Sequence, residues 1–349
     1  MFYLLSLLTG VLECGWIAFG IVHGFSFWQV LCYPLAYHIG NLFPRPVSLK
    51  RNHLSLMCGL SFLLGSLTSI GIFSENILFW LTCMSLFLLS AVIQSVRSGI
   101  KCDGNRFKKR MFRIAGFMIA PLAAVVPALV LVVSSVVAFV ALKNYNGEYR
   151  LVKISGQGGC SVVMIFHQLH YFFYAHTTLA GVCLWLFRES SWQGIVLGML
   201  AFCGTWLTYS SVEPVVSRIT GKVLPVFYVG HMGISLLLFA MSFVNDKLPF
   251  FLLWFITGFG GGVVYTIAAR AKAIKNYNKD AMTISENVGH TLGLLVAVMM
   301  AALFQTKSMR IMLVLGALSA VFAVVFMALG PGKEKKYENI GNESKMHAC

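Results

Sequence analysis

The sequence predicts an all-α polytopic membrane protein with about twelve transmembrane helices in two six-helix bundles, or eleven on the competing count. Hydrophobic residues make up 58% of its 349 residues and charged residues only 11%, whereas about a quarter of an ordinary soluble domain is charged. Apolar runs of about 20 residues recur along the chain, which is the length that an α-helix needs to cross a bilayer. These runs leave no room for a sizeable soluble domain.

The charge and the cysteine content argue against several other classes of protein. The net charge of +15 falls mostly in predicted loops and the C-terminal tail, so it indicates membrane topology rather than nucleic-acid binding. The nine cysteines are scattered and have neither zinc-site spacing nor the pattern of a disulfide framework. We therefore expect no cofactor and no metal ligands. The first apolar run lacks a basic n-region, which indicates a retained span rather than a signal peptide.

The apolar runs predict the helices in chain order. Polar or basic turns separate most of them, and a polar tail follows the last. We expect spans at residues 2–24, 26–43, 54–73 and 77–96, two short crossings within 114–142, and further spans at 159–187, 194–211, 224–244, 250–269, 283–304 and 309–329.

The run at 114–142 decides the count, because it is long for one crossing and short for two. Pro121 and Pro127 interrupt it, and prolines at this spacing kink or break a membrane helix. Basic loops favour the cytoplasmic side. The basic loops of the second half lie on the same side as the basic loop at 97–113 only if residues 114–142 cross the membrane twice. This parity favours a broken hairpin, twelve crossings and two cytoplasmic termini, whereas a single kinked helix would make eleven.

Twelve crossings divide the chain into two halves joined by a polar segment. The predicted domains are an N-terminal helical bundle at 1–142, a cytoplasmic connecting loop at 143–158, a C-terminal helical bundle at 159–330 and a C-terminal tail at 331–349. We expect the tail to be disordered, because it is polar and offers little apolar surface to bury.

The stretch at 165–178 carries an unusual set of polar side chains inside an apolar run. On a helix, one face about 100° wide holds most of them, while His176 falls on the opposite side with the apolar residues. Such a face is expected to line a water-filled cavity or, in the alternative interpretation, to hydrogen-bond to neighbouring helices. The face consists of His167, His170, Tyr171, Tyr174 and Thr178.

Other ionisable residues lie in the predicted spans. Glu13 is halfway along the first span, where a carboxylate must be protonated or paired, and His38 is in the second. Glu286 and His290 are four residues apart in the eleventh span, so they share a face and can exchange a hydrogen bond. A carboxylate beside an imidazole can hold or pass protons near neutral pH. For both glutamates a structural role, between helices or at a helix N-terminus, is the alternative.

Several features carry a family resemblance: the six-plus-six layout, the loop after the second span at 38–46, the glycines at 258–262 and the glycine-spaced segment 287–293. In these features the chain resembles the major facilitator superfamily of secondary transporters. It departs from the family at Asn41 and Pro44, where an acidic-basic pair is usual, so those gating contacts are not carried over. The resemblance implies two pseudo-symmetric bundles that rock about a cavity lined by the first, fourth, seventh and tenth helices.

The predicted function is secondary active transport by alternating access, not enzymatic catalysis. The sequence has no P-loop for ATP, so an ion gradient would drive transport, and protons suit Glu13, Glu286 and the histidines. A seventh span bearing histidine and tyrosine is similar to metallophore exporters of the family, so we expect export of a small polar or metal-chelating solute. The alternatives are a transition-metal ion transporter and, from the HxxH at 167–170, a histidine-dependent intramembrane enzyme, although neither HExxH nor GxSxG occurs.

The expected location is the cell membrane (inner or plasma), where the chain would be a multi-pass monomer with both termini cytoplasmic. Its expected partners are the solute, protons and the lipid bilayer, and not nucleic acid. The residues expected on the pathway of substrate and protons are Glu13, His38, His167, His170, Tyr171, Tyr174, Thr178, Glu286 and His290.

Overall fold

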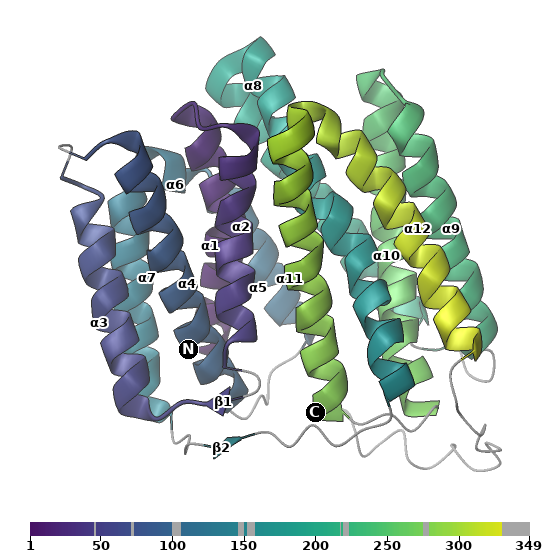
Figure 1. The fold of residues 1–349 in the computed structure, drawn as a ribbon, viewed down its shortest axis with the longest axis horizontal. Coiled ribbons are helices and arrows are strands. Elements are labelled where there is room, and N and C mark those ends of the chain that lie inside the picture. The colour runs from purple at the N-terminus through teal and green to yellow at the C-terminus, as the bar shows by residue number, and fades with distance from the viewer. Residues whose placement is uncertain are drawn as a thin grey trace.

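The computed structural model describes residues 1–44, 47–70, 73–99, 106–145, 150–151, 158–216, 218, 223–274 and 279–329. Most of these residues lie in helices (Figure 1). The helices are α1 (Phe2–Val22), α2 (Phe27–Leu42), α3 (Arg51–Leu67), α4 (Glu75–Gly99), α5 (Arg106–Ile119), α6 (Leu122–Val125), α7 (Pro127–Ala141), α8 (Gly158–Val216), α9 (Val223–Phe243), α10 (Lys247–Ile274), α11 (Lys279–Phe304) and α12 (Ser308–Leu329). The described residues also include the short helices η1 (Leu142–Asn144) and η2 (Gln305–Lys307), and a two-residue antiparallel pairing of β1 (Val47–Ser48) with β2 (Arg150–Leu151).

The helical prediction is confirmed, and several helices suit a membrane. Six described stretches are long and apolar enough to cross a bilayer. Large apolar side chains also cover the outside of the molecule: Leu56 is 63% exposed, Leu236 68% and Leu303 70%. An exposed apolar surface of this kind suits lipid rather than water. The number of crossings stays a prediction, because some of the six stretches contain more than one helix.

The run at 114–142 is divided at its two prolines. Pro121 precedes the short helix α6, and Pro127 begins α7 after a residue with non-helical backbone angles. Proline has no N–H to donate inside a helix, and its fixed φ suits the first helical position. The two flanking helices have different neighbours, since α5 packs on α1 and α7 packs on α3.

The long helix α8 also consists of two helices that follow one another without an intervening loop. Ser190 and Ser191 have non-helical backbone angles, and Ser191 has a φ of +50°. This break lies between the two spans predicted at 159–187 and 194–211. The second part of α8 packs closely on α10, where a Cβ on Gly258 would lie 3.1 Å from the Thr205 side chain.

Contacts sort the helices into an N-terminal group, α1 to α7, and a C-terminal group, α8 to α12. Within the first group α1 packs on α2 and α5, and α4 packs on α2 and α3; within the second, α8 packs on α10, α11 and α12. Between the groups α11 packs on α2, and α8 packs on α1, α2 and α5. In Figure 1 the first group lies on the left and the second on the right, with α8 and α11 near the boundary. The predicted domain boundaries stay a prediction, and the tail at 331–349 and most of the connecting loop at 143–158 lie outside the described residues.

Candidate functional site

A close crossing of α1 and α5 brings Glu13 into contact with Arg113. Gly10 and Gly116 face each other there, and a Cβ on Gly116 would lie 3.0 Å from the Cα of Gly10, so the backbones approach as only glycine allows. The Glu13 side chain, one turn further along α1, is only 1% exposed. Nε of Arg113 donates to Oε2 of Glu13 at 3.1 Å, and Nη2 of Arg113 contacts the same oxygen. The buried carboxylate is therefore paired with a guanidinium.

Arg113 is a functional candidate that the sequence analysis missed, because it assigned this residue to the basic loop at 97–113. That assignment is wrong at its end: α5 begins at Arg106, so Arg113 lies about two turns inside a helix. Its Cζ lies 4.9 Å from the centre of the Trp206 ring, a distance at which the ring face attracts a cation. The available signal was that the basic residues run directly into the apolar stretch that begins at Ile114.

Two histidines face the other oxygen of Glu13. Nε2 of His38, from α2, lies 3.7 Å from Oε1, and Nε2 of His176, from α8, lies 3.6 Å from it. Both separations exceed a hydrogen bond. Within the described residues, neither of these nitrogens has a hydrogen-bond partner. We call Glu13, His38 and His176 the Glu13 cluster; one donor atom from each lies within 4.8 Å of the others, so the three could hold a metal ion.

His176 was predicted to lie on the side of this helix opposite the polar face, and it was not among the predicted site residues. In the structure α8 is surrounded by helices from both groups, and His176 is fully buried between them. The only available signal was an imidazole within an apolar run, which is costly to bury without a partner.

His38 and His290 approach each other where α2 meets α11. Their ring centres are 5.6 Å apart, and the His290 ring stacks on Phe172 of α8 with 4.0 Å between centres. Nε2 of His290 forms a 2.9 Å hydrogen bond with Oε1 of Gln168. Glu286 is half-buried one turn earlier on α11, and its predicted hydrogen bond with His290 stays a prediction. His290 thus lies beside the Glu13 cluster.

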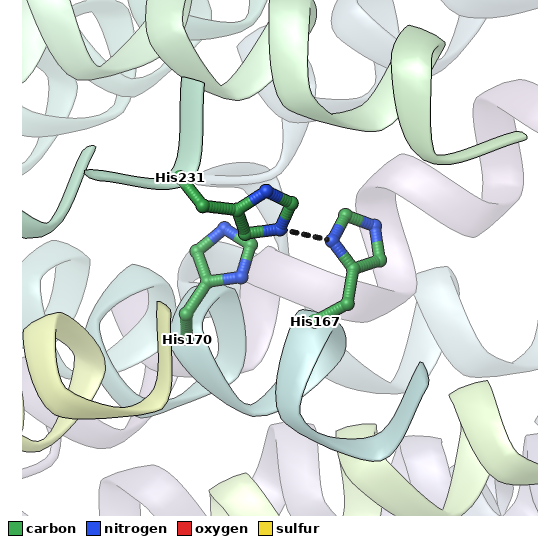
Figure 2. A group of neighbouring side chains, drawn as sticks. All are labelled: His167, His170 and His231. Atoms are coloured by element: carbon green, nitrogen blue, oxygen red, sulfur yellow. Dashed lines mark hydrogen bonds between the residues drawn. The ribbon is translucent and has the colours of Figure 1, made fainter. Parts of the chain in front are cut away.

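The first part of α8 carries a second group of histidines. His167 and His170, both on the predicted polar face, meet His231 of α9, and all three are at least 97% buried. Figure 2 shows the three rings together, with His231 reaching from its own helix to the two on α8. We call these residues the three-histidine cluster. His231 was missed, because nothing in the apolar run at 223–243 indicates which helix it faces.

The other residues of the predicted polar face are also enclosed. Tyr174 and Thr178 are buried and Tyr171 is half-buried, so in this conformation the face does not open to water. The Tyr171 hydroxyl and the Thr178 hydroxyl have no hydrogen-bond partner among the described residues. Their predicted role in a water-filled pathway stays a prediction that requires another conformation.

Several solved transporters have a similar fold. A bacterial metal transporter aligns with a TM-score of 0.61 at 14% identity, over 94% of this chain and 97% of that chain. A bacterial homologue of the iron transporter ferroportin, in an outward-facing state with soaked iron, aligns with a TM-score of 0.57 at 14% identity, over 94% of this chain and 98% of that chain. A mutant of the nucleoside transporter NupG aligns with a TM-score of 0.60 at 10% identity, over 95% of this chain and 100% of that chain.

No protein-family model matches the chain, and no curated protein is similar to it in sequence. At these identities the likeness concerns the fold alone. The alignments extend over nearly the full length of all four chains. Together with the apolar helices, they indicate a multi-pass membrane protein whose fold is that of these solved transporters, and a transporter-like fold is what the resemblance to the major facilitator superfamily predicted.

Proposed function

We propose that this chain is a proton-coupled secondary active transporter that exports a small polar or metal-chelating solute by alternating access. In this proposal it crosses the cell membrane about twelve times as two six-helix bundles, with both termini cytoplasmic. The observation that supports it is the buried Glu13 carboxylate, held between Arg113 and two histidines where the two helix groups meet. The likeness to solved transporters favours a carrier over an intramembrane enzyme.

The two oxygens of Glu13 have different neighbours, which suits a site that exchanges a proton for a solute. Oε2 accepts from Arg113, whereas Oε1 faces two imidazoles that are too distant to hydrogen-bond with it. A proton on Glu13 would remove the charge that holds Arg113. A solute with a cationic or hydrogen-bond-donating group would compete with that proton for the same carboxylate, and such competition couples the two movements.

The location of the site suits alternating access. Glu13 and His38 belong to the N-terminal group, and His176 belongs to the C-terminal group. If the two groups rock against each other, His176 moves away from Glu13 and the space between them opens. The two conformations then differ in the contacts that they offer to a proton and to a solute, which is what a ligand needs in order to shift the equilibrium.

Proteoliposomes that contain a trapped pH-sensitive dye test this proposal. The probe solutes are citrate, free histidine and the Co²⁺ complexes of each, supplied as gradients across the membrane. We expect a protein-dependent pH change with at least one probe, and we expect Glu13→Gln to abolish it, because the amide keeps the shape but cannot titrate. The matched control is Glu213→Gln, which removes a carboxylate paired with Arg110 outside the cluster and should leave transport intact.

Uphill transport by the Glu13→Gln variant would contradict the proposal. If folded Glu13→Gln accumulates the solute against its gradient as well as the parent does, with the same pH dependence, the coupling proposal is wrong. Glu13 then has a structural role, and Glu286 becomes the next candidate. Size-exclusion elution and thermal unfolding of each variant would separate a loss of coupling from a loss of folding.

A second candidate function is transport of a transition-metal ion itself. The Glu13 cluster offers two imidazole nitrogens and one carboxylate oxygen within 4.8 Å of one another, a donor set that binds divalent iron and similar ions. Two of the solved structures with this fold are a metal transporter and a homologue of an iron transporter. Uptake of Co²⁺ alone, followed with a trapped metal-sensitive dye and lost in His176→Gln, would favour this candidate over the chelated solute.

A further inference from the structure

We propose that the three-histidine cluster binds one divalent first-row transition-metal ion, at a site separate from the Glu13 cluster. His167 and His170 are three residues apart on α8 and therefore share a face, and His231 approaches them from α9. Imidazole is a preferred ligand for Zn²⁺, Cu²⁺, Ni²⁺ and iron. Three imidazoles with an open fourth position make a known type of metal site.

The distances suit such an ion after small side-chain movements. Nδ1 of His167 and Nε2 of His231 are 3.0 Å apart, and one ring nitrogen from each of the three residues lies within 4.8 Å of the others. In a tetrahedral site with metal–nitrogen bonds of about 2.1 Å, the nitrogens are about 3.4 Å apart. Rotation of the imidazole of His170 toward the other two rings would reach that spacing.

Hydrogen bonds assign the nitrogen that His231 would offer. Its Nδ1 lies 2.9 Å from the backbone oxygen of Phe227, and because a carbonyl oxygen only accepts, Nδ1 must carry the hydrogen. Nε2 of His231 therefore presents a lone pair to the cluster. A backbone carbonyl that orients a metal-binding histidine in this way is a common supporting contact in metal sites.

His170 supplies an independent observation. Its side chain is 3% exposed, and its Nδ1 has no hydrogen-bond partner within the part of the chain that the structure describes. A buried polar nitrogen without a partner is unfavourable. The ring centre of His170 lies 5.4 Å from that of His167 and 5.5 Å from that of His231, so an ion held by the other two rings would also be within its reach.

An aromatic side chain also lies beside the cluster on α9. The Phe227 ring lies against His231, with 4.0 Å between ring centres.

The position of the cluster indicates a resident ion rather than cargo, a point that rests on the alternating-access proposal. All three ligands belong to the C-terminal group, which would move as one body. Rocking of the two groups would leave the cluster intact, whereas it would separate the residues of the Glu13 cluster. An ion here would tie α8 to α9 in both conformations.

Co²⁺ binding to the purified full-length protein, stripped with a chelator, tests the proposal. Co²⁺ is the probe because it gives a strong visible absorption in a four-coordinate site. We expect that absorption in the parent and, at the same intensity per chain, in Glu13→Gln. We expect no absorption and at least about 100-fold weaker binding in His170→Gln, by comparison with the 10- to 100-fold loss that follows removal of a supporting contact.

The variants are chosen to separate binding from folding. His170→Gln breaks no hydrogen bond at Nδ1, since that nitrogen has no described partner; His231→Gln is a second variant should His170→Gln fail to fold. His23→Gln is the matched control: its Nδ1 makes the same 2.9 Å contact with a carbonyl four residues earlier, but the residue is exposed and outside the cluster. It should bind Co²⁺ as the parent does.

Two results would overturn the proposal. One is unchanged Co²⁺ binding in folded His170→Gln or His231→Gln. The other is loss of the absorption in Glu13→Gln with retention in the two histidine variants, which would assign the ion to the Glu13 cluster. A failure of the transport proposal leaves this experiment valid, because it measures binding in detergent and needs no transported solute.

Discussion

Replacement of Arg113 by methionine should destabilise the protein strongly, because it leaves a buried carboxylate without its counter-charge. Glu13 is 1% exposed, so its charge cannot turn toward water, and the histidines nearby are not within hydrogen-bond distance. Removing one partner of a buried ion pair typically costs about 3–5 kcal/mol. The cost should shrink as the pH is lowered, because protonation of Glu13 removes the stranded charge.

The reverse change, Glu13→Gln, should cost less, about 1–3 kcal/mol. Arg113 keeps 27% of its side-chain surface exposed and retains the face of Trp206, with its Cζ 4.9 Å from the ring centre. The glutamine can still accept a hydrogen bond from the guanidinium. The double variant should be more stable than the sum of the single changes implies by about 2 kcal/mol, since both charges leave together.

Unfolding of the four proteins in one detergent at pH 7 completes this cycle. The comparison cycle is Arg110→Met with Glu213→Gln, whose side chains are 15% and 23% exposed; there we expect a coupling of about 1 kcal/mol or less, because water reaches both groups. Strict additivity in the Arg113–Glu13 cycle would refute the reasoning. So would a cost of Arg113→Met that does not change with pH.

The remaining predictions concern packing, access and topology. Gly116→Ala should sharply lower the yield of folded protein, because its Cβ would lie 3.0 Å from a backbone Cα of α1. Gly59→Ala, whose Cβ would have no atom within 4 Å, should be neutral. The yield of each variant after detergent extraction and size exclusion tests this. In a background without native cysteines, Tyr174→Cys should react with a water-soluble thiol reagent during transport and Phe173→Cys should not, although both side chains are less than 9% exposed here. Equal protection of the two cysteines would favour hydrogen bonding between helices over a water pathway. Reporter fusions at Lys143 and in the C-terminal tail should both be cytoplasmic, and an external location for either would exclude the twelve-crossing layout.

Much of the fold follows from local sequence. Apolar runs of bilayer length predict helices because a backbone in lipid must satisfy its hydrogen bonds internally. Pro121 and Pro127 predict a divided run for the same reason, since proline cannot donate, and the structure begins or interrupts helices at both. Glycines such as Gly258 predict close helix contact, and α10 does approach α8 there.

The sequence by itself thus determined the helices, the all-α membrane class and Glu13 as a candidate site residue. Only the tertiary structure decided which side chains meet. Arg113 lies 100 residues from Glu13 along the chain, and His38 and His176 come from two further helices. Helical periodicity identifies a functional face only when the other face meets a different environment. Because α8 is packed on several sides by other helices, its pattern could not show that His176 turns toward Glu13 while His167 and His170 turn toward His231.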